Sequence, residues 1–450
     1  MSQEYSQHQS PYSYKLLSFK ITSHRHDVPI NITNNVSMFE INEGCDSPFL
    51  TGSFIMLDDL RFFDGVDVNG TEKCEIILDN PTVESSPITL NFVISHLKGT
   101  RKVQDQKEML DFAIIEDSGF NNEIKRLSRS YQGTRSQIIA KILLDGLGLQ
   151  IDFPEIECVQ PSMKVCIPYM TPFQACNWIL RGMTTASGLP FYLFKTMKTK
   201  NIQLKSLEEM ISLKPWNKTP YVFSLANANA QGDAQQNIDS ISLFNVENFN
   251  SNTETGIIHK MLGGNIGSSN SVTDMGSGQS EKFQYNVNSV FDELKDLGII
   301  PKGEQPIFHT AMEFKDLNIA NHNNLNIHRV VMNKTYRDHN NIYEGYDTAT
   351  FKLDAVRRGV NNYLRSATVN LKIPGAPFLL DQVNRSVGTR INFIYIANKS
   401  DVGENENGET MADLVRSGTY MIAQARHLFT PDKEHKVSIT GVKLGRSTTG

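Results

Sequence analysis

The segments ATVNLKI (367–373), INFIYI (391–396) and SGTYMIAQARHLFTPDKEHKVSITGVKL (417–444) decide the fold that this sequence predicts. In the first segment Ala367, Val369, Leu371 and Ile373 alternate with polar residues, and this period of two is typical of a half-buried β-strand. Pro374-Gly375 ends that strand, and INFIYI predicts the next one. Four strands joined by turns are therefore expected at the end of the chain, as in a closing β-barrel.

The longest of these segments predicts a hairpin. Two alternating runs surround Thr430-Pro431-Asp432, where Pro431 occupies a favourable turn position. In the second run Val437 and Ile439 share one phase of the alternation, whereas Val442 and Leu444 take the other. Because Gly441 stands where the phase changes, we predict a β-bulge there that bends the strand, with a positive φ at the glycine.

Length and composition are those of an ordinary globular protein. A chain of 450 residues is expected to form about three domains of ~150 residues each. The net charge of −5 and the lack of a basic block argue against a dedicated nucleic-acid binder. No apolar run reaches the ~18 residues of a membrane span. The first residues, MSQEYSQHQSPYSY, do not form a signal peptide, so we expect synthesis in the cytosol and no membrane insertion.

The cysteines predict no special chemistry. There are five, and their spacing contains no C-x-x-C motif, so neither a disulfide framework nor a zinc site is favoured. We expect reduced structural thiols at each position, namely Cys45, Cys74, Cys158, Cys166 and Cys176.

The first part of the chain predicts β structure. Residues 1–14 are polar and are expected to form a flexible arm. Residues 15–118 are expected to form a first tube-like β-barrel or sandwich, because they contain the strand candidates LTGSFIML (50–57), TEKCEIIL (71–78), ITLNFVI (88–94) and LDFAII (110–115).

Helix signals begin after this part, and residues 119–205 predict a small α/β domain. Thr134 with Gln137 can form a capping box, and Gly146 is a plausible stop for the helix that follows. A second box combines Thr171 with Gln174, and it is followed by the apolar face Cys176, Ile179, Leu180 and Met183. GLPFYLFKT (188–196) predicts a strand, and Ser206 with Glu209 caps a short helix.

The remaining chain predicts a second tube-like barrel that is split by an insertion. The barrel would comprise residues 206–250 and 350–446, including a helix over 351–365. The insertion, 251–349, is rich in Asn, Gly and Ser. Its stretch GGNIGSSNSVTDMGSGQS (263–280) is expected to be a loop or disordered, and VFDELKDL (290–297) a short helix before Gly298. The predicted fold class is therefore α+β and β-rich, with two antiparallel barrels.

No catalytic, cofactor-binding or metal-binding residue is predicted, and no cofactor. GSGQS (276–280) lacks the Lys-Ser/Thr of a phosphate loop and is best interpreted as a linker. The histidines show no i, i+4 pairing or Cys companions, so they are expected to be solvated or structural: His24, His26, His322, His328 and His339. His427 has no accompanying nucleophile motif, and we expect it to form a hydrogen bond that pins the hairpin.

Charged pairs along the chain do not form a site either. Asp58-Asp59 and Glu208-Glu209 are adjacent, so their side chains point apart in regular structure, which is wrong for acid and base catalysis. Arg101-Lys102 and Arg357-Arg358 are short basic pairs, more typical of surface or interface charges than of phosphate clamps.

In sequence order, several segments resemble central baseplate hub proteins of contractile-tailed bacteriophages. The resemblance is carried in the terminal strands by VNLKIPGAP (369–377), SGTYMIAQARH (417–427) and KVSITGVKLG (436–445). Earlier segments agree with it: LTGSFIMLDDL (50–60), VNGTEKCEIIL (68–78), LSRSYQGTRSQIIAKIL (127–143), IPYMTPFQACNWILRGM (167–183) and FYLFKTMKTKNIQLKSLEEMI (191–211). The chain departs from the family pattern at LLDQVNRSVG (379–388), in the Asn-rich insertion and at the acidic ENENGET (404–410).

The resemblance implies a structural virion protein that is assembled in the host cytoplasm and is not an enzyme. In that family three subunits, each with two tube-like barrels, form a ring with pseudo-sixfold symmetry. The implied partners are a trimeric membrane-piercing spike, hexameric tail-tube or tube-initiator rings, baseplate wedge proteins and a tape-measure protein. The ring would form part of the duct for DNA ejection by contractile injection, without sequence-specific nucleic-acid recognition. A duct wall should avoid free Lys and Arg, because each phosphate contact adds affinity.

Two other functions remain open from the sequence. A tail-associated cell-wall hydrolase would travel with spike components, although no lysozyme-like spacing of Glu, Asp and Thr is present. A tail module that binds host glycans would use the barrels and the Asn-rich loops, although those loops lack clustered aromatic residues. Assays on peptidoglycan and on glycan arrays separate these functions from a structural role.

Overall fold

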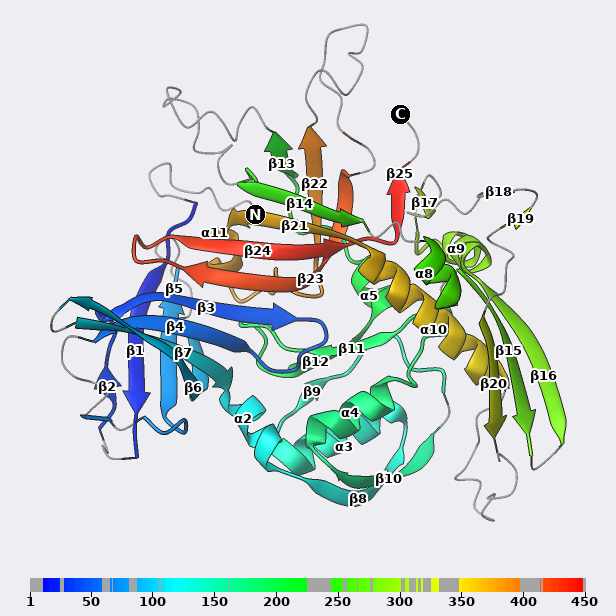
Figure 1. The fold of residues 1–450 in the computed structure, drawn as a ribbon, viewed down its shortest axis with the longest axis horizontal. Coiled ribbons are helices and arrows are strands. Elements are labelled where there is room, and N and C mark those ends of the chain that lie inside the picture. Colours follow the sequence, from blue (N-terminus) through cyan, green and yellow to red (C-terminus); the bar gives the residue numbers. More distant parts are fainter. Residues whose placement is uncertain are drawn as a thin grey trace, which may run out of the picture.

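The structure is a computed structural model (Figure 1). It describes residues 11–24, 28–58, 65–66, 68–80, 87–104, 107–160, 162–224, 244–253, 257–264, 266–275, 278–300, 304–306, 313–314, 317–318, 325–331, 348–396, 413 and 416–447. Predictions for His26, Asp59, His322, His339 and ENENGET (404–410) lie outside the described residues.

Seven strands form the first β part of the molecule. They pair antiparallel in the order β3-β4-β7-β6-β5-β1-β2, and they include all four strand candidates predicted before residue 118. Alternate residues of these strands point to the inner face of the curled sheet and form a core rich in phenylalanine. In this core Phe54 and Phe112 stack with ring centroids 5.0 Å apart. The strands are β1 (Lys15–Thr22), β2 (Ile30–Asn31), β3 (Val36–Gly44), β4 (Thr51–Asp58), β5 (Lys73–Asp79), β6 (Ile88–Gln104) and β7 (Lys107–Glu116).

Helices and short strands follow around a core of their own. Both predicted capping boxes are present: the side chains of Thr134 and Thr171 accept hydrogen bonds from the backbone N–H groups of Gln137 and Gln174. The elements are α2 (Asp117–Ile124), β8 (Leu127–Gly133), α3 (Arg135–Leu147), β9 (Ile151–Asp152), β10 (Met163–Met170), α4 (Pro172–Leu180), β11 (Phe191–Phe194), β12 (Ile202–Ser206) and α5 (Leu207–Ser212).

The predicted stop of α3 at Gly146 is wrong. The helix ends at Gly148, which has the left-handed conformation (φ 70°) typical of a helix C-terminus. Gly146 lies in the last turn of the helix, where a Cβ would be only 2.6 Å from Pro172 Cγ. Its role is therefore to let α3 approach the start of α4.

The second β part contains the strands predicted at the end of the chain. Val369, Leu371 and Ile373 are buried as their alternation predicts. The order of pairing is β14-β21-β24-β23, and β22 pairs with both β23 and β13. The elements are β13 (Tyr221–Ser224), β14 (Asn248–Thr253), β21 (Ala367–Pro374), α11 (Ala376–Leu379), β22 (Arg390–Ile396), β23 (Gly418–Phe429), β24 (His435–Val442) and β25 (Gly445–Ser447).

The terminal hairpin is confirmed, but the bulge is not where the sequence placed it. The register of β23 against β24 shifts between Ile422 and Gln424, so the extra residue is Ala423 in the first strand of the hairpin. Gly441 is not among the positive-φ glycines. It pairs directly with Val369 of β21, and a Cβ on it would be 3.0 Å from Val369 Cγ2 and 3.2 Å from Tyr420 Cβ. A glycine occupies this position because the neighbouring side chains leave little room for a Cβ, and not because the backbone has a positive φ.

The expectation of a loop over 263–280 is wrong, because most of that stretch belongs to a sheet in the order β16-β15-β20. Val272 is buried on the inner face of β15 beside Ser268 and Asn270, whose polar atoms are satisfied locally: Asn270 Nδ2 donates to Ser268 Oγ (3.1 Å). Gly278 (φ 69°) precedes β16 in the hairpin between β15 and β16. Small polar residues can thus form a buried strand face when they bond to one another.

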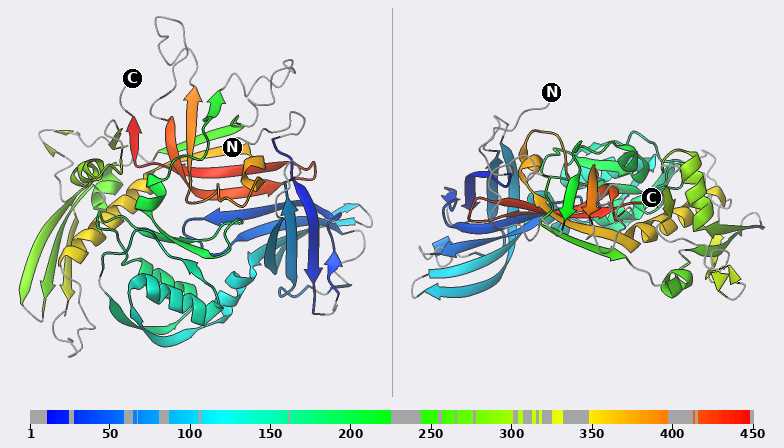
Figure 2. Two further views of the ribbon diagram at one scale, coloured as in Figure 1. Left: turned by 180° about the vertical axis from the view of Figure 1, so that it is seen from behind. Right: turned by 90° about the horizontal axis from the view of Figure 1, so that it is seen from above.

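Helices complete this inserted region. The helix predicted over 290–297 is α9, which begins three residues earlier, and the helix predicted over 351–365 is α10. The elements are α8 (Ile257–Leu262), β15 (Gly267–Asp274), β16 (Gln279–Asn286), α9 (Val287–Asp296), β17 (Glu304–Pro306), β18 (Glu313–Phe314), β19 (Leu317–Asn318), β20 (Leu325–Val331) and α10 (Thr348–Ser366). Figures 1 and 2 place this region and the first β part at opposite ends of the long axis.

The two β parts are joined edge to edge. β3 pairs antiparallel with β23 over six residue pairs, from Gln424↔Gly44 to Phe429↔Phe39, which makes one continuous sheet of 13 strands. Among the described strands this pairing follows an open path and closes no barrel. Residues 11–14 pack on the hairpin, since Tyr14 is buried and the His435 N–H donates to Tyr12 O (2.6 Å), so the predicted flexible arm does not include them.

Candidate functional site

The joined strands present one polar face, made of side chains that stand opposite each other across six strands. One row contains Asn250, Asn370, Thr440 and Gln424, and the next contains Asn248, Lys372, Ser438, Arg426, Asn42 and Thr51. Directly opposed residues of neighbouring strands project to the same side. We call this surface, together with Glu40, Glu247 and Lys436, the polar face.

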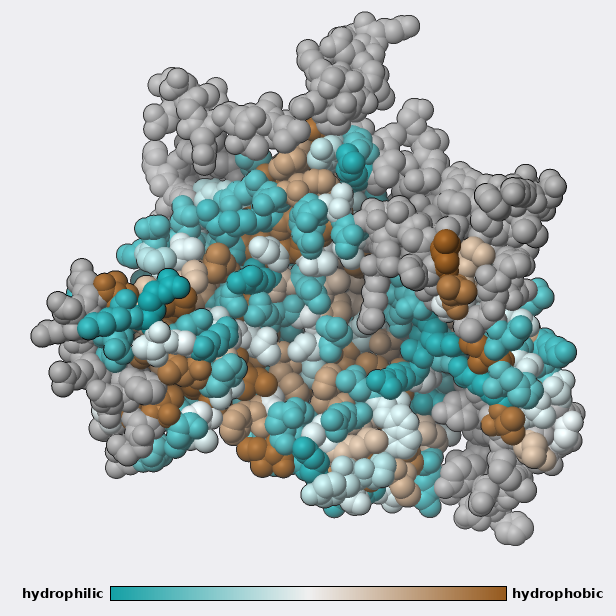
Figure 3. All heavy atoms as spheres, viewed as in Figure 1, coloured by the Kyte–Doolittle hydropathy of each residue, from teal (hydrophilic) through white to brown (hydrophobic). Residues whose placement is uncertain are grey.

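Amide and hydroxyl groups dominate the polar face. Thr440 Oγ1 of β24 donates a hydrogen bond to Asn370 Oδ1 of the neighbouring strand β21 (3.0 Å). A shallow hollow of ≈ 450 Å³ lies over Asn42, Thr51, Asn370, Gln424 and Thr440. In Figure 3 hydrophilic residues cover much of the surface over β21, β24 and β23. This surface therefore offers amide and hydroxyl groups that can donate and accept hydrogen bonds.

The cations of the polar face are each paired with a carboxylate. Arg426 Nε lies 2.8 Å from Glu40 Oε2, and Lys372 Nζ lies 3.4 Å from Glu247 Oε2. Lys436 Nζ lies 3.2 Å from Glu247 Oε1 and 3.0 Å from Glu434 Oε2. Partial burial lowers the pKa of Lys436, but the hydrogen bonds to Glu434 and Glu247 outweigh burial and raise it.

Behind the polar face, His427 contacts His435 across the hairpin. His427 Nδ1 lies 3.1 Å from His435 Nε2, so the predicted pinning contact of His427 is present. Both rings are fully buried, and His435 stacks on Phe429 with centroids 4.2 Å apart. Burial, and then the charge of His427, lower the pKa of His435 well below its usual value. The His435 ring is therefore neutral near pH 7.

Glu43 of β3 brings the histidine pair into contact with the α/β region. Its Oε1 lies 3.8 Å from His427 Nε2 and accepts a hydrogen bond from the Met197 N–H (2.7 Å). Among the described residues, Glu43 Oε2, His427 Nε2 and His435 Nδ1 have no hydrogen-bond partner. Both β parts and the segment after β11 thus meet at one buried polar joint.

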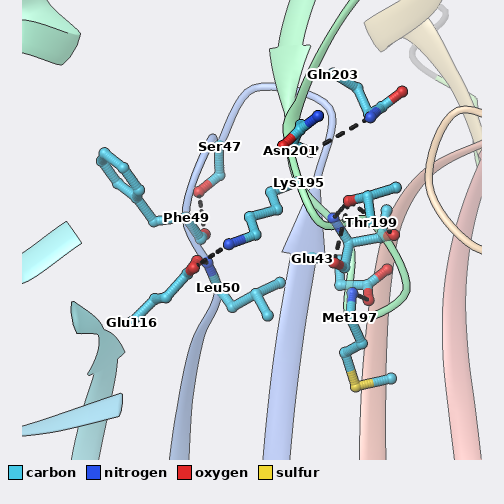
Figure 4. A network of polar contacts seen from close by, with 11 residues as sticks. Glu43, Ser47, Phe49, Leu50, Glu116, Lys195, Met197, Thr199, Asn201 and Gln203 are labelled. Atoms are coloured by element: carbon cyan, nitrogen blue, oxygen red, sulfur yellow. Dashed lines mark hydrogen bonds and ion pairs between the residues drawn. The ribbon is translucent and has the colours of Figure 1, made fainter. Parts of the chain in front are cut away.

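A second buried contact holds the same segment, as Figure 4 shows. Lys195 Nζ forms an ion pair with Glu116 Oε1 at the end of β7, and Glu116 Oε2 accepts from the Leu50 N–H (3.1 Å). Both side chains of the pair are largely buried. The segment 195–199 is therefore fixed to the first β part by Lys195 and to the sheet junction by Met197.

The other residues that the sequence singled out are spread over the molecule. His24 Nδ1 contacts Asn69 Nδ2 (3.3 Å), and the exposed His328 contacts Ser271. Glu208 accepts a hydrogen bond from Ser187 Oγ (2.7 Å). In the pair Asp58-Asp59 the structure describes Asp58, which is buried. Of the described histidines that the sequence singled out, His427 is the one that shares a buried cluster with other ionisable side chains.

The arginine pair Arg357-Arg358 has a structural setting. Asp354 Oδ1 lies 2.6 Å from Arg357 Nη2, and Asp354 Oδ2 lies 2.7 Å from Arg329 Nη2 and 3.7 Å from Arg358 Nε. Burial raises the pKa of Asp354, but the hydrogen bonds and charges of Arg357 and Arg329 lower it overall. The cluster ties α10 to β20.

The cysteines are all free thiols, and burial raises the pKa of Cys45 to about 12. Within the described part of the chain, no three His, Cys, Asp or Glu side chains converge as a metal site requires. None of the described helices is both long and apolar enough to cross a bilayer.

Comparison with known proteins rests on structure alone. No protein-family model matches the chain, and no curated protein is significantly similar in sequence. A tail protein from Neisseria meningitidis MC58 superposes with a TM-score of 0.53 at 12% identity, over 96% of this chain and 97% of that one. The chain has the fold of phage tail proteins. The 43 kDa tail protein of prophage MuSo2 from Shewanella oneidensis agrees, with a TM-score of 0.51 at 9% identity over 95% and 98% of the two chains.

This tail-protein fold is the one that the resemblance to baseplate hub proteins implied. The sequence did not predict Glu43, Glu247 or Glu116 as functional residues, because each contacts partners that are distant in the chain. The strand MFEINEG (38–44) carries a local signal, because Glu43 takes the phase of the apolar Phe39 and Ile41, whereas Glu40 takes the opposite phase.

Proposed function

We propose that the protein is a structural component of a phage tail, the baseplate hub that joins the hexameric tail tube to a trimeric spike. The tail-protein fold over nearly the whole chain supports this proposal. The observation that carries it furthest is the polar face, which runs from β14 across the junction of β23 with β3 to β4. A wall built from such faces suits a duct.

In this proposal three copies form a ring, and each copy contributes two tube-like units, one from each β part. Both parts are mainly antiparallel, although β13 pairs with β22 in parallel in the second part, and they are joined through β3 and β23. Six similar units in a threefold ring would match a hexameric tube on one side and a trimeric spike on the other. The inserted region 251–349 and the α/β region 119–205 would face wedge proteins on the outside.

In the same ring the polar face lines the lumen. Its amides and hydroxyls remain hydrated, and its lysines and arginine are paired with carboxylates. Nucleic acid binds proteins mainly through free cations that release counterions from phosphates. A face without free cations lets DNA and a tape-measure protein pass without being held.

Light scattering of the purified protein at micromolar concentration, alone and with its candidate spike partner, tests the proposal. We expect a mass of three times 50.6 kDa in at least one condition. A monomer in both conditions would reject the hub. Turnover of peptidoglycan by the same sample would instead support the cell-wall hydrolase, and retention on a glycan array the glycan-binding module.

A further inference from the structure

Glu247 occupies the centre of the charged part of the polar face. Its two carboxylate oxygens are divided between two lysines, with Oε2 3.4 Å from Lys372 Nζ and Oε1 3.2 Å from Lys436 Nζ. Glu40 pairs with Arg426, whose Nε lies 2.8 Å from Glu40 Oε2. Three carboxylates, those of Glu40, Glu247 and Glu434, thus pair with three cations on neighbouring strands, because Glu434 is a second partner of Lys436.

The carboxylate of Glu247 is held in place by backbone and side-chain contacts. The Glu247 N–H donates to Lys372 O (2.8 Å), and the side chain is about three-quarters buried. Tyr12 lies against it: burial, the charge of Glu247 and a hydrogen bond to Glu247 raise the pKa of Tyr12. The Lys436 ammonium also lies over the Tyr12 ring, 5.2 Å from its centroid. The arrangement is built into the fold around β14.

Stability alone does not account for these pairs. Ion pairs between partly exposed side chains contribute only ~0–1 kcal/mol in measured cases, and Arg426 is more than half exposed. The same three cations would matter more to a polyanion. Lys372 and Arg426 occupy one cross-strand row and are separated by β24, a distance of about 10 Å between strand axes. Without their carboxylates they would form a compact basic patch.

We propose that Glu247 and Glu40 are charge-masking residues, which keep the polar face from holding a nucleic-acid backbone that passes over it. This inference rests on the proposed function of the polar face as a duct wall. The face tolerates Lys372, Lys436 and Arg426 because their charge is cancelled within the same chain.

The test compares the wild-type protein with the double variant Glu40→Gln, Glu247→Gln, which keeps side-chain size and removes the two masking charges. Binding of a fluorescent short DNA duplex is followed by anisotropy between about 50 mM and 200 mM salt. Each freed cation that contacts a phosphate steepens the slope of log affinity against log salt by about 0.9. Because Glu434 still pairs with Lys436 in the double variant, two cations are freed, those of Lys372 and Arg426. We expect the double variant to bind at least about tenfold more tightly at the lowest salt, with a slope steeper by about 2.

Two controls make the result specific to the polar face. Glu75→Gln frees Lys20 of an exposed pair on β1 and β5 (3.8 Å), and its slope should change by no more than about 1. Adding Lys372→Gln, Lys436→Gln and Arg426→Gln to the double variant should restore wild-type binding. If the double variant melts early, the single variants Glu40→Gln and Glu247→Gln are measured instead, each with a smaller gain in the same direction.

Unchanged DNA affinity in a folded double variant, or equal gains in Glu75→Gln, would overturn the inference. The oligomer mass of each sample, measured by light scattering, shows whether the charge-masking inference or the proposed hub function has failed. A trimer with unchanged affinity rejects only the masking. A monomer in which the double variant gains affinity and the rescue removes it supports the masking and rejects the hub.

Discussion

His427 and His435 contact each other across the terminal hairpin, with Nδ1 of the first 3.1 Å from Nε2 of the second, inside the joint between the two β parts. Each ring also has a nitrogen that no described residue satisfies. The fully buried His435 ring can hold the hairpin only while it is neutral, because a buried positive charge at this position would be costly.

Acid should therefore weaken this joint. The pKa of His435 is lowered by burial and by His427, so the unfolded chain takes up a proton, near its ordinary pKa of 6.5, before the folded one does. The neutral His435 ring makes its full contribution to the free energy of unfolding above pH 6.5. Below pH 6.5 this contribution falls by up to about 1.4 kcal/mol per pH unit. Melting temperatures between pH 7.5 and about pH 5 measure the loss.

The variant His435→Phe checks the assignment, because it keeps the stack on Phe429 and removes the titrating group. We expect a less acid-sensitive melting temperature even if the variant is less stable at pH 7. Equal acid sensitivity in both proteins would mean that other groups cause the loss.

Gly441→Val should destabilise the protein because of packing. A Cβ at this position would lie 3.0 Å from Val369 Cγ2 and 3.2 Å from Tyr420 Cβ, so a branched side chain forces both neighbours to move. Overpacking of this kind costs about 1–3 kcal/mol. Ser438→Val on the exposed side of the same strand is the matched control, and there we expect little change or slight stabilisation. The free energy of unfolding of both variants is measured by chemical denaturation. A Gly441→Val protein as stable as the wild type would show that packing does not exclude a side chain at this position.

Loss of Lys195 should cost more than loss of an exposed lysine. Lys195→Met leaves the largely buried Glu116 carboxylate without its partner, which in comparable cases costs about 3–5 kcal/mol. Lys20→Met breaks the exposed pair with Glu75 and should cost at most about 1 kcal/mol. Adding Glu116→Gln to Lys195→Met should recover part of the loss. Equal denaturation midpoints for the two single variants would show that the buried pair does not hold the segment 195–199.

The strands and capped helices were predictable because their signals are local. Alternation placed β5 and β21, and the capping boxes at Thr134 and Thr171 placed α3 and α4, since neighbouring residues determine both features. β15 was missed because Ser268 and Asn270 are polar yet buried, and their mutual hydrogen bonds cannot be inferred from periodicity. β14 likewise continues to Thr253, past the predicted boundary at residue 250, because its pairing with β21 extends it.

The polar face could not be predicted from the sequence, because it too depends on contacts between distant residues. It depends on the pairing of β3 with β23, which are separated by most of the chain, and on Glu247 reaching two lysines from different strands. Periodicity places Ser438 and Thr440 on one side of a strand, but only the register places Arg426 and Asn42 beside them. The resemblance to hub proteins implied the tail-protein fold, but the two barrels that it also implied are not confirmed. The residues of the polar face came from the structure.

Electron cryomicroscopy of the purified protein in its largest stable oligomer tests the central claim most directly. We expect a threefold ring in which Asn370, Thr440 and Gln424 of every copy face a central opening. A monomer, or a ring in which this face points outward or is buried between copies, would contradict it.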